Sequence, residues 1–136
     1  MIQTWPSILI TDDDDALREA LGTIFAPRGF RVFLADDGDN ALRIIESNRV
    51  DIVLMDMHMP RLTGLETIRR VKARFAKLPC ILMSADADDQ LVREATQADA
   101  YAVLRKPVTG CQVSQTVCDA LACAYDWTPG SNQFFV

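Results

Sequence analysis

The sequence lacks the residues needed for the common small zinc sites. It has one histidine, His58, and four cysteines that form no Cys-x-x-Cys pair. No recognised zinc-binding spacing can be assembled from this set. We therefore expect free thiols that pack as small apolar groups at Cys80, Cys111, Cys118 and Cys123.

Long hydrophobic runs and an excess of positive charge are also missing. No stretch of about 18 apolar residues occurs, and the first residues lack the pattern of a secretory signal, so we predict a cytoplasmic protein without membrane contact. Lys and Arg number 14 against 19 Asp and Glu, which gives a net charge of -5 and opposes direct nucleic-acid binding. The basic residues between positions 69 and 77 are interpreted as the solvated face of a helix.

The composition is that of one globular domain. Apolar residues make up 49% and charged residues 24% of the 136 positions. We assign residues 1–126 to this domain and residues 127–136 to a C-terminal tail that lacks periodicity. The tail aromatics Trp127, Phe134 and Phe135 would suit a docking peptide or the start of a linker, but a flexible end or the cut point of a longer chain is the favoured interpretation.

Short apolar runs alternate with segments of helical periodicity along the chain. Strands are predicted at Ser7–Thr11, Arg31–Ala35, Asp51–Met55, Cys80–Met83 and Ala102–Leu104. Helices are predicted at about Asp14–Phe25, Asn40–Asn48, Leu65–Phe75, Asp88–Gln97 and Cys111–Tyr125. This alternation is typical of βα units, and it predicts an α/β fold with an open, doubly wound parallel sheet.

The last two helices differ in how firmly they should pack. The fourth has the narrowest apolar stripe, formed by Leu91, Val92 and Ala95, so we expect it to be loosely docked. The fifth carries a longer stripe, formed by Val113, Val117, Leu121 and Ala124.

Polar residues follow four of the predicted strands. Residues 12–15 are all Asp and follow the first strand, Asp56 follows the third, Ser84 the fourth and Lys106 the fifth. The carboxyl ends of parallel strands meet at one edge, where such sheets bind ligands. Clustered carboxylates repel one another unless a cation lies among them, and oxygen ligands that leave room for a phosphate favour Mg²⁺. Asp14 and Asp15 are interpreted instead as the start of the first helix.

These groups match one reaction. In-line phosphoryl transfer onto an aspartate uses a carboxylate nucleophile, a magnesium ion, a lysine and a hydroxyl. We predict that Asp56 is the acceptor and that Asp12 and Asp13 hold the metal. Lys106 would neutralise a carboxylate or a phosphoryl oxygen, and Ser84 would supply the hydroxyl.

In these segments the sequence resembles the receiver domains of two-component response regulators, which form the CheY-like superfamily. The resemblance is carried by ILITDDDD at residues 8–15, DIVLMDMHMPRLTG at 51–64, MSA at 83–85 and RKP at 105–107. It spans about Ile8 to Tyr125. It implies a flavodoxin-like (βα)5 fold with strand order 2-1-3-4-5.

The resemblance also implies roles for these residues. A histidine kinase or a histidine phosphotransfer protein would donate its phosphoryl group to Asp56, so the chain would be a phosphoacceptor and not an enzyme acting on other substrates. Mg²⁺ would be held by Asp13, by Asp12 through water, by Asp56 and by the backbone carbonyl of His58. Ser84 and Lys106 would then bind phosphoryl oxygens and shift the fourth helix and the fifth strand.

One position departs from the family pattern. Val103 stands three residues before Lys106, where family members usually carry Tyr or Phe as part of the switch. Tyr101 lies two residues before Val103 and so points to the same face of the strand, but its position along the strand differs from that of the family's aromatic residue. Switching is therefore expected to rely on Ser84 and loop movement, or on the surface of the fifth helix.

Two further expectations concern binding. A pseudo-receiver, which binds partners through the same fold without phosphorylation, stays open as the alternative function. A homodimer through the fourth helix, the fifth strand and the fifth helix is a further possibility implied by the resemblance. The imidazole of His58 is expected to lie exposed in a loop, with a role in slowing or speeding loss of the phosphoryl group as a minor alternative.

Overall fold

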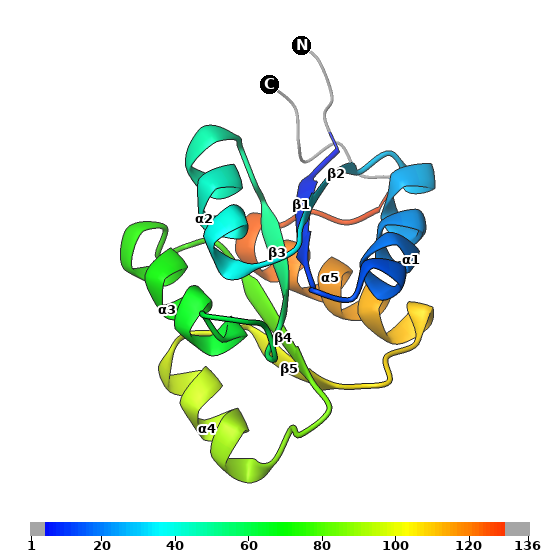
Figure 1. The fold of residues 1–136 in the computed structure, drawn as a ribbon. Helices are drawn as coiled ribbons and strands as arrows, with labels where there is room; N and C mark the ends of the chain where they lie inside the picture. Colours follow the sequence, from blue (N-terminus) through cyan, green and yellow to red (C-terminus); the bar gives the residue numbers. More distant parts are fainter. Residues whose placement is uncertain (1–4, 130–136) are drawn as a thin grey trace.

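A computed structural model describes residues 5–129, which form one parallel sheet covered by helices on both faces (Figure 1). The strands are β1 (Ser7–Thr11), β2 (Arg31–Ala35), β3 (Ile52–Asp56), β4 (Cys80–Ser84) and β5 (Ala102–Arg105). The helices are α1 (Asp15–Phe25), α2 (Gly38–Ser47), α3 (Gly64–Arg74), α4 (Asp89–Gln97) and α5 (Gly110–Tyr125), with a short 3-10 turn at Ala26–Arg28. The strand order is β2-β1-β3-β4-β5, which confirms the predicted flavodoxin-like fold.

The two layers of helices bury separate cores. Helices α1 and α5 cover one face, where Ile8 and Ile10 of β1 contribute to the packing, and α2, α3 and α4 cover the face that receives Leu9. Alternate residues of a strand point to opposite faces, so both faces need apolar side chains. All five residues of β1, β3 and β4 are accordingly buried, as the continuous apolar runs predicted.

Each of the five helices follows a strand and begins with a side-chain cap. Asp14, Asp37, Thr63, Asp88 and Thr109 accept hydrogen bonds from backbone N–H groups in the first turn of their helices. Such caps satisfy amide groups that have no partner inside the helix. The cap by Asp14 confirms the interpretation of that residue as a helix start.

The elements were located correctly, with shifts of one or two residues at their ends. Strands β3 and β4 extend to Asp56 and Ser84, so both polar residues are the last of their strands. Helix α2 begins two residues earlier than predicted, because Asp37 caps it at Gly38.

Two burial predictions, for Val92 and Ala124, were wrong. Val92 is 43% exposed, so α4 buries only Leu91 and Ala95, which narrows its contact with the sheet further. On α5, Ala124 is exposed and Ala120 takes its place in the core, one residue before Leu121. A small rotation of the helix about its axis exchanges Ala124 for Ala120 in the buried stripe, because the two residues lie about one turn of 3.6 residues apart.

The four cysteines differ in burial. Cys80 of β4 is fully buried, and burial raises the pKa of its thiol to about 12. Cys118 is half-buried and packs against the core, whereas Cys111 and Cys123 are exposed, so the packing prediction was wrong for these two. All four are free, as predicted.

Trp127, predicted to belong to the tail, is instead a core residue. Its side chain is 2% exposed, and its ring centroid lies 5.5 Å from that of Trp5 and 5.7 Å from that of Phe30. This aromatic cluster seals the core beneath α1 and α5. The packed part of the chain therefore includes Trp127, whereas Phe134 and Phe135 lie outside the described residues. Between residues 5 and 129, no helix is both long and apolar enough to cross a membrane.

Candidate functional site

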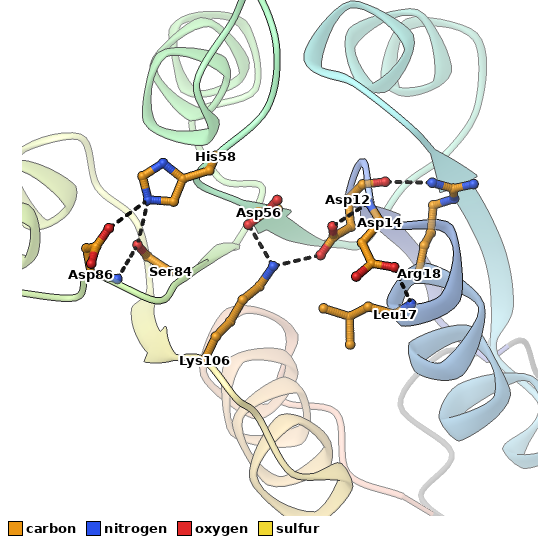
Figure 2. Close-up of polar contacts among 9 residues, drawn as sticks. All are labelled: Asp12, Asp14, Leu17, Arg18, Asp56, His58, Ser84, Asp86 and Lys106. Carbon is orange, nitrogen blue, oxygen red and sulfur yellow. Dashed lines mark hydrogen bonds and ion pairs between the residues drawn. The ribbon is translucent and has the colours of Figure 1, made fainter.

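Four adjacent strands bring the predicted site residues together at the carboxyl edge of the sheet (Figure 2). Asp12 directly follows β1, Asp56 ends β3, Ser84 ends β4 and Lys106 directly follows β5. Residues separated by 94 positions in the sequence thus come within hydrogen-bonding distance, as between Asp12 and Lys106. The predicted convergence of these groups is confirmed.

An acidic pocket forms between β1 and β3. Asp12, Asp13 and Asp56 each offer a carboxylate oxygen within 4.8 Å of the others, the one such group found within residues 5–129. Asp12 and Asp56 are buried and Asp13 is exposed. Three carboxylates with one open side suit a hard divalent cation that keeps some of its waters.

Lys106 lies between the two buried carboxylates. Its Nζ atom donates to Asp56 Oδ1 at 2.8 Å and to Asp12 Oδ2 at 3.0 Å. The ammonium group therefore holds both acids in place and partly neutralises them (Figure 2).

Burial and charge act against each other in this group. Burial raises the pKa of Asp56, and the charge of Asp12 raises it further, although the hydrogen bond from Lys106 opposes both effects. For Lys106, burial lowers the pKa, but the hydrogen bonds to Asp56 and Asp12 outweigh it and the net shift is upward. The lysine is therefore held in its charged form beside a carboxylate that is poorly solvated.

Arg18 holds the loop that carries the first two acids. Its Nη1 donates to the backbone carbonyl oxygen of Asp12 at 2.7 Å, and its Nη2 bonds to Asp15 at 2.6 Å. Asp12 Oδ1 in turn accepts from the backbone N–H of Asp14 at 2.9 Å. Sequence reasoning missed Arg18, because only the wrapping of α1 against the end of β1 brings its side chain to this loop.

The loop after β3 is fixed by close backbone contacts. Met57 donates its N–H to the carbonyl of Met83 at 2.8 Å, and its own carbonyl accepts from Gly64 at 2.9 Å. A Cβ atom at Gly64 would collide with the backbone carbonyl of Asp56, so glycine is required here. Thr63 and Glu66 then start α3 with a capping box.

Ser84 and His58 meet on the other side of Asp56. The Ser84 hydroxyl accepts from the backbone N–H of Asp86 at 3.1 Å, and its Oγ lies 3.5 Å from His58 Nε2. The same His58 nitrogen lies 3.4 Å from Asp86 Oδ2. The His58 ring is exposed, as expected, but it also lies next to the Ser84 hydroxyl, a contact that the sequence did not indicate (Figure 2). Beside it, a cavity of about 190 Å³ opens toward the start of α4.

Val103 lies within β5, and Tyr101 directly precedes that strand. Val103 pairs with Leu82 of β4, and its half-buried side chain packs on the core beneath α4. Tyr101 is 42% exposed, two residues before it. Neither residue is among those that contact Asp56, Ser84 or Lys106 through side-chain hydrogen bonds.

Comparisons with known proteins give a consistent result. A family model described as the response regulator receiver domain matches residues 8–117. The regulatory protein AtoC of Escherichia coli is 36% identical over 100 residues, covering 74% of this chain and 22% of that protein. The transcriptional regulatory protein AfsQ1 of Streptomyces coelicolor is 38% identical over 107 residues, covering 77% of this chain and 46% of that protein. The chain thus spans less than half the length of these relatives.

Solved structures share the fold. A response regulator receiver domain protein from Clostridium thermocellum superposes with a TM-score of 0.82 at 27% identity, covering 88% of this chain and 96% of that one. The CheY of Borrelia burgdorferi, solved as a complex with CheX, BeF3 and Mg²⁺, gives 0.81 at 26% identity and covers 87% of this chain and 90% of that one. The fold, the acidic pocket and the family match agree: the chain belongs to the response regulator receiver domains, the phosphoacceptor domains of two-component signalling.

Proposed function

We propose that Asp56 is the phosphoryl acceptor of this receiver domain and that a histidine kinase or a histidine phosphotransfer protein is the donor. The observation that carries the proposal is the position of Lys106, whose ammonium group bonds both Asp56 and Asp12 at the end of the sheet. Asp56 is 3% exposed, and burial raises its pKa. A desolvated carboxylate is a stronger nucleophile than a hydrated one, provided that a nearby cation keeps it ionised.

The proposed reaction follows from this arrangement. One carboxylate oxygen of Asp56 attacks the phosphorus of a phosphohistidine, and the O–P bond forms as the P–N bond breaks. The electron pair of the broken bond stays on the leaving imidazole, which takes up a proton. Lys106 holds Asp56 in orientation before the attack, and afterwards its ammonium group balances negative charge on a phosphoryl oxygen.

The acidic pocket fits the magnesium ion that this family uses. The donors are all oxygens, and two of the three carboxylates are buried, so their mutual repulsion favours a cation. In our proposal Asp13, Asp56 and the backbone carbonyl of His58 bind the ion, and Asp12 contacts it through water. The ion would supply further positive charge to the phosphoryl oxygens during transfer.

Ser84 is proposed to report the phosphoryl group to the rest of the domain. Its hydroxyl lies at the end of β4 and accepts from the N–H of Asp86, in the loop that leads to α4. A new hydrogen bond from Ser84 to a phosphoryl oxygen would change this contact and bias the position of α4, which buries only two side chains. Because Val103 lacks an aromatic ring, we assign the switch to Ser84 and this loop.

The surface formed by α4, β5 and α5 is the proposed site for the downstream partner. It includes the exposed side chains of Val92 and Tyr101. That this same surface pairs two copies of the chain stays a prediction. In this proposal the chain does no chemistry beyond Mg²⁺-dependent gain and loss of its own phosphoryl group.

The test is intact mass after incubation with Mg²⁺ and a small phosphodonor such as acetyl phosphate. We expect one phosphoryl group on the parent, and none on Asp56→Asn or in samples without magnesium. Asp51→Asn is the matched control, because Asp51 is also buried but lies at the opposite end of the sheet, where it accepts from the N–H of Ser7. Absence of phosphorylation in the parent, with magnesium binding intact, would favour a pseudo-receiver.

A further inference from the structure

Strand β2 forms the edge of the sheet opposite β5 and pairs with β1 alone among the strands of residues 5–129. Among residues 5–129, three large apolar residues are notably exposed, and two of them, Val92 and Tyr101, lie on the α4 and β5 side. The third, Leu34, is 43% exposed and lies on β2. This edge is therefore a second apolar surface, far from the one proposed above.

A groove runs beside this edge, between β2 and α1. It has a volume of about 400 Å³ and is open to solvent. Its walls are mostly small or apolar: Gly22 and Thr23 of α1, Ala26 of the 3-10 turn that follows, and Val32 and Leu34 of β2. One charged residue, Glu19, lies at its end. Small residues on α1 allow another helix or strand to approach closely.

The backbone of β2 presents bonding groups to the same side. The N–H of Arg31 donates to Pro6, and the carbonyl of Ala35 accepts from Asp12, both at 3.1 Å, so these two residues face β1. Because bonding direction alternates along a strand, Val32 and Leu34 direct their N–H and C=O groups away from the sheet. Exposed edges usually carry lysine, proline or a bulge that discourages pairing, and the sequence RVFLA has neither lysine nor proline.

We propose that β2 pairs with β2 of a second copy of this chain, antiparallel, about a two-fold axis at Phe33. This register sets Val32 opposite Leu34 and Arg31 opposite Ala35 across the interface. The outward backbone groups of Val32 and Leu34 then form the hydrogen-bonded pairs, and the two Phe33 residues form a non-bonded pair with close side chains. The two sheets become one continuous sheet.

Charge complementarity supports a second copy as the occupant. Arg31 begins β2 and Asp36 directly follows it, and both are exposed. Antiparallel pairing brings the end of β2 that carries Arg31 close to the end of the partner's strand, which Asp36 follows, so opposite charges lie at both ends of the interface. On the α1 side, Gly22 lies beside Val32 and Leu34, close to the proposed two-fold axis. The two α1 helices are then antiparallel, so Glu19 of one copy lies near Ala26 of the other and away from its Glu19.

The first test compares two apolar residues of equal exposure. Sedimentation of the unphosphorylated 136-residue chain should show the weight-average mass rising toward twice the monomer value with concentration. Leu34→Glu should remove this rise, and Val92→Glu should keep it, since both native side chains are 43% exposed. Arg31→Glu should weaken the dimer at least tenfold, and adding Asp36→Arg to that variant should restore it.

The second test traps the two-fold axis. In a background with Cys111, Cys118 and Cys123 changed to serine, Phe33→Cys should form an intermolecular disulfide, because a non-bonded pair places Cα atoms about 4.5 Å apart, within disulfide range. Glu46→Cys, on the exposed side of α2, is the control. The proposal is overturned if Phe33→Cys cross-links no faster than this control. It is equally overturned if Val92→Glu abolishes dimers that Leu34→Glu retains.

Discussion

The contact most central to the site is open to a direct test, in which Lys106→Met removes the ammonium group but keeps the length of the side chain. Lys106 Nζ lies 2.8 Å from Asp56 and 3.0 Å from Asp12, whose side chains are 4% and 0% exposed. Breaking a buried ion pair by removing one partner costs about 3–5 kcal/mol, because a charge stays buried without compensation.

The lower end of that range applies here. The Lys106 side chain is 20% exposed, so water reaches the space it leaves. We expect a loss of about 3 kcal/mol in the free energy of unfolding, which for a domain of this size lowers the melting temperature by roughly 10 °C.

Magnesium should reverse much of this loss. The lysine and the cation compete for the same carboxylate oxygens, so the variant should bind Mg²⁺ more tightly than the parent. A ligand at ten times its dissociation constant stabilises a protein by about 1.4 kcal/mol, and the gain grows with affinity. Thermal unfolding followed by circular dichroism, with and without Mg²⁺, should show a larger magnesium-induced rise for Lys106→Met than for the parent.

Two variants control this experiment. Lys72→Met removes a lysine whose Nζ donates to the neutral carbonyl of Leu78 at 3.0 Å, so it should not change the response to magnesium. Adding Asp56→Asn to Lys106→Met removes one of the two uncompensated carboxylates and should recover most of the stability. Equal melting temperatures for Lys106→Met and the parent without magnesium, or equal responses to it, would refute the reasoning.

Three further predictions concern residues that the fold brings into contact. Arg18→Ala should weaken Mg²⁺ binding about tenfold in a calorimetric titration, because it removes the hydrogen bond from Arg18 to the Asp12 carbonyl at 2.7 Å. Arg43→Ala removes the same charge from α2 and should leave Mg²⁺ binding unchanged. Equal losses of affinity in the two variants would show an effect of net charge only. His58→Ala should shorten the half-life of the phosphorylated protein several-fold, since the ring leans over Ser84 and limits access by water, and an unchanged half-life would rule out this role. Trp127→Ala should cost about 3–5 kcal/mol in urea unfolding, and a loss below about 1 kcal/mol would contradict its place in the core.

Sequence reasoning predicted the fold and the convergence of the polar residues at its carboxyl edge for a common reason. Helix and strand periodicities are local properties, and the carboxyl end of each strand is marked by a change from apolar to polar residues, as at Asp56 and Ser84. Once the strands are known to be parallel, their ends must meet. The convergence of Asp12, Asp56 and Lys106 at one edge of the sheet was therefore predictable from the sequence.

Contacts made by long side chains were not predictable in this way. Arg18 and His58 are polar residues near a helix start and in a loop, and many such residues only face solvent. Their partners, the Asp12 carbonyl and the Ser84 hydroxyl, depend on how the loops fold back over the sheet. Trp127 was missed for a related reason, because no periodicity extends past Asp126 to signal burial.

The sequence alone thus determined the order and type of the elements and which polar residues gather at the carboxyl edge, since both follow from local patterns and from the rule that parallel strand ends converge. Tertiary structure decided which side chains meet across that edge, how far the core extends at Trp127 and which face of α4 is buried. It also decided that Leu34 lies exposed on the outer strand. These features depend on the rotation of each helix and the path of each loop, which are set by packing between segments distant in the chain.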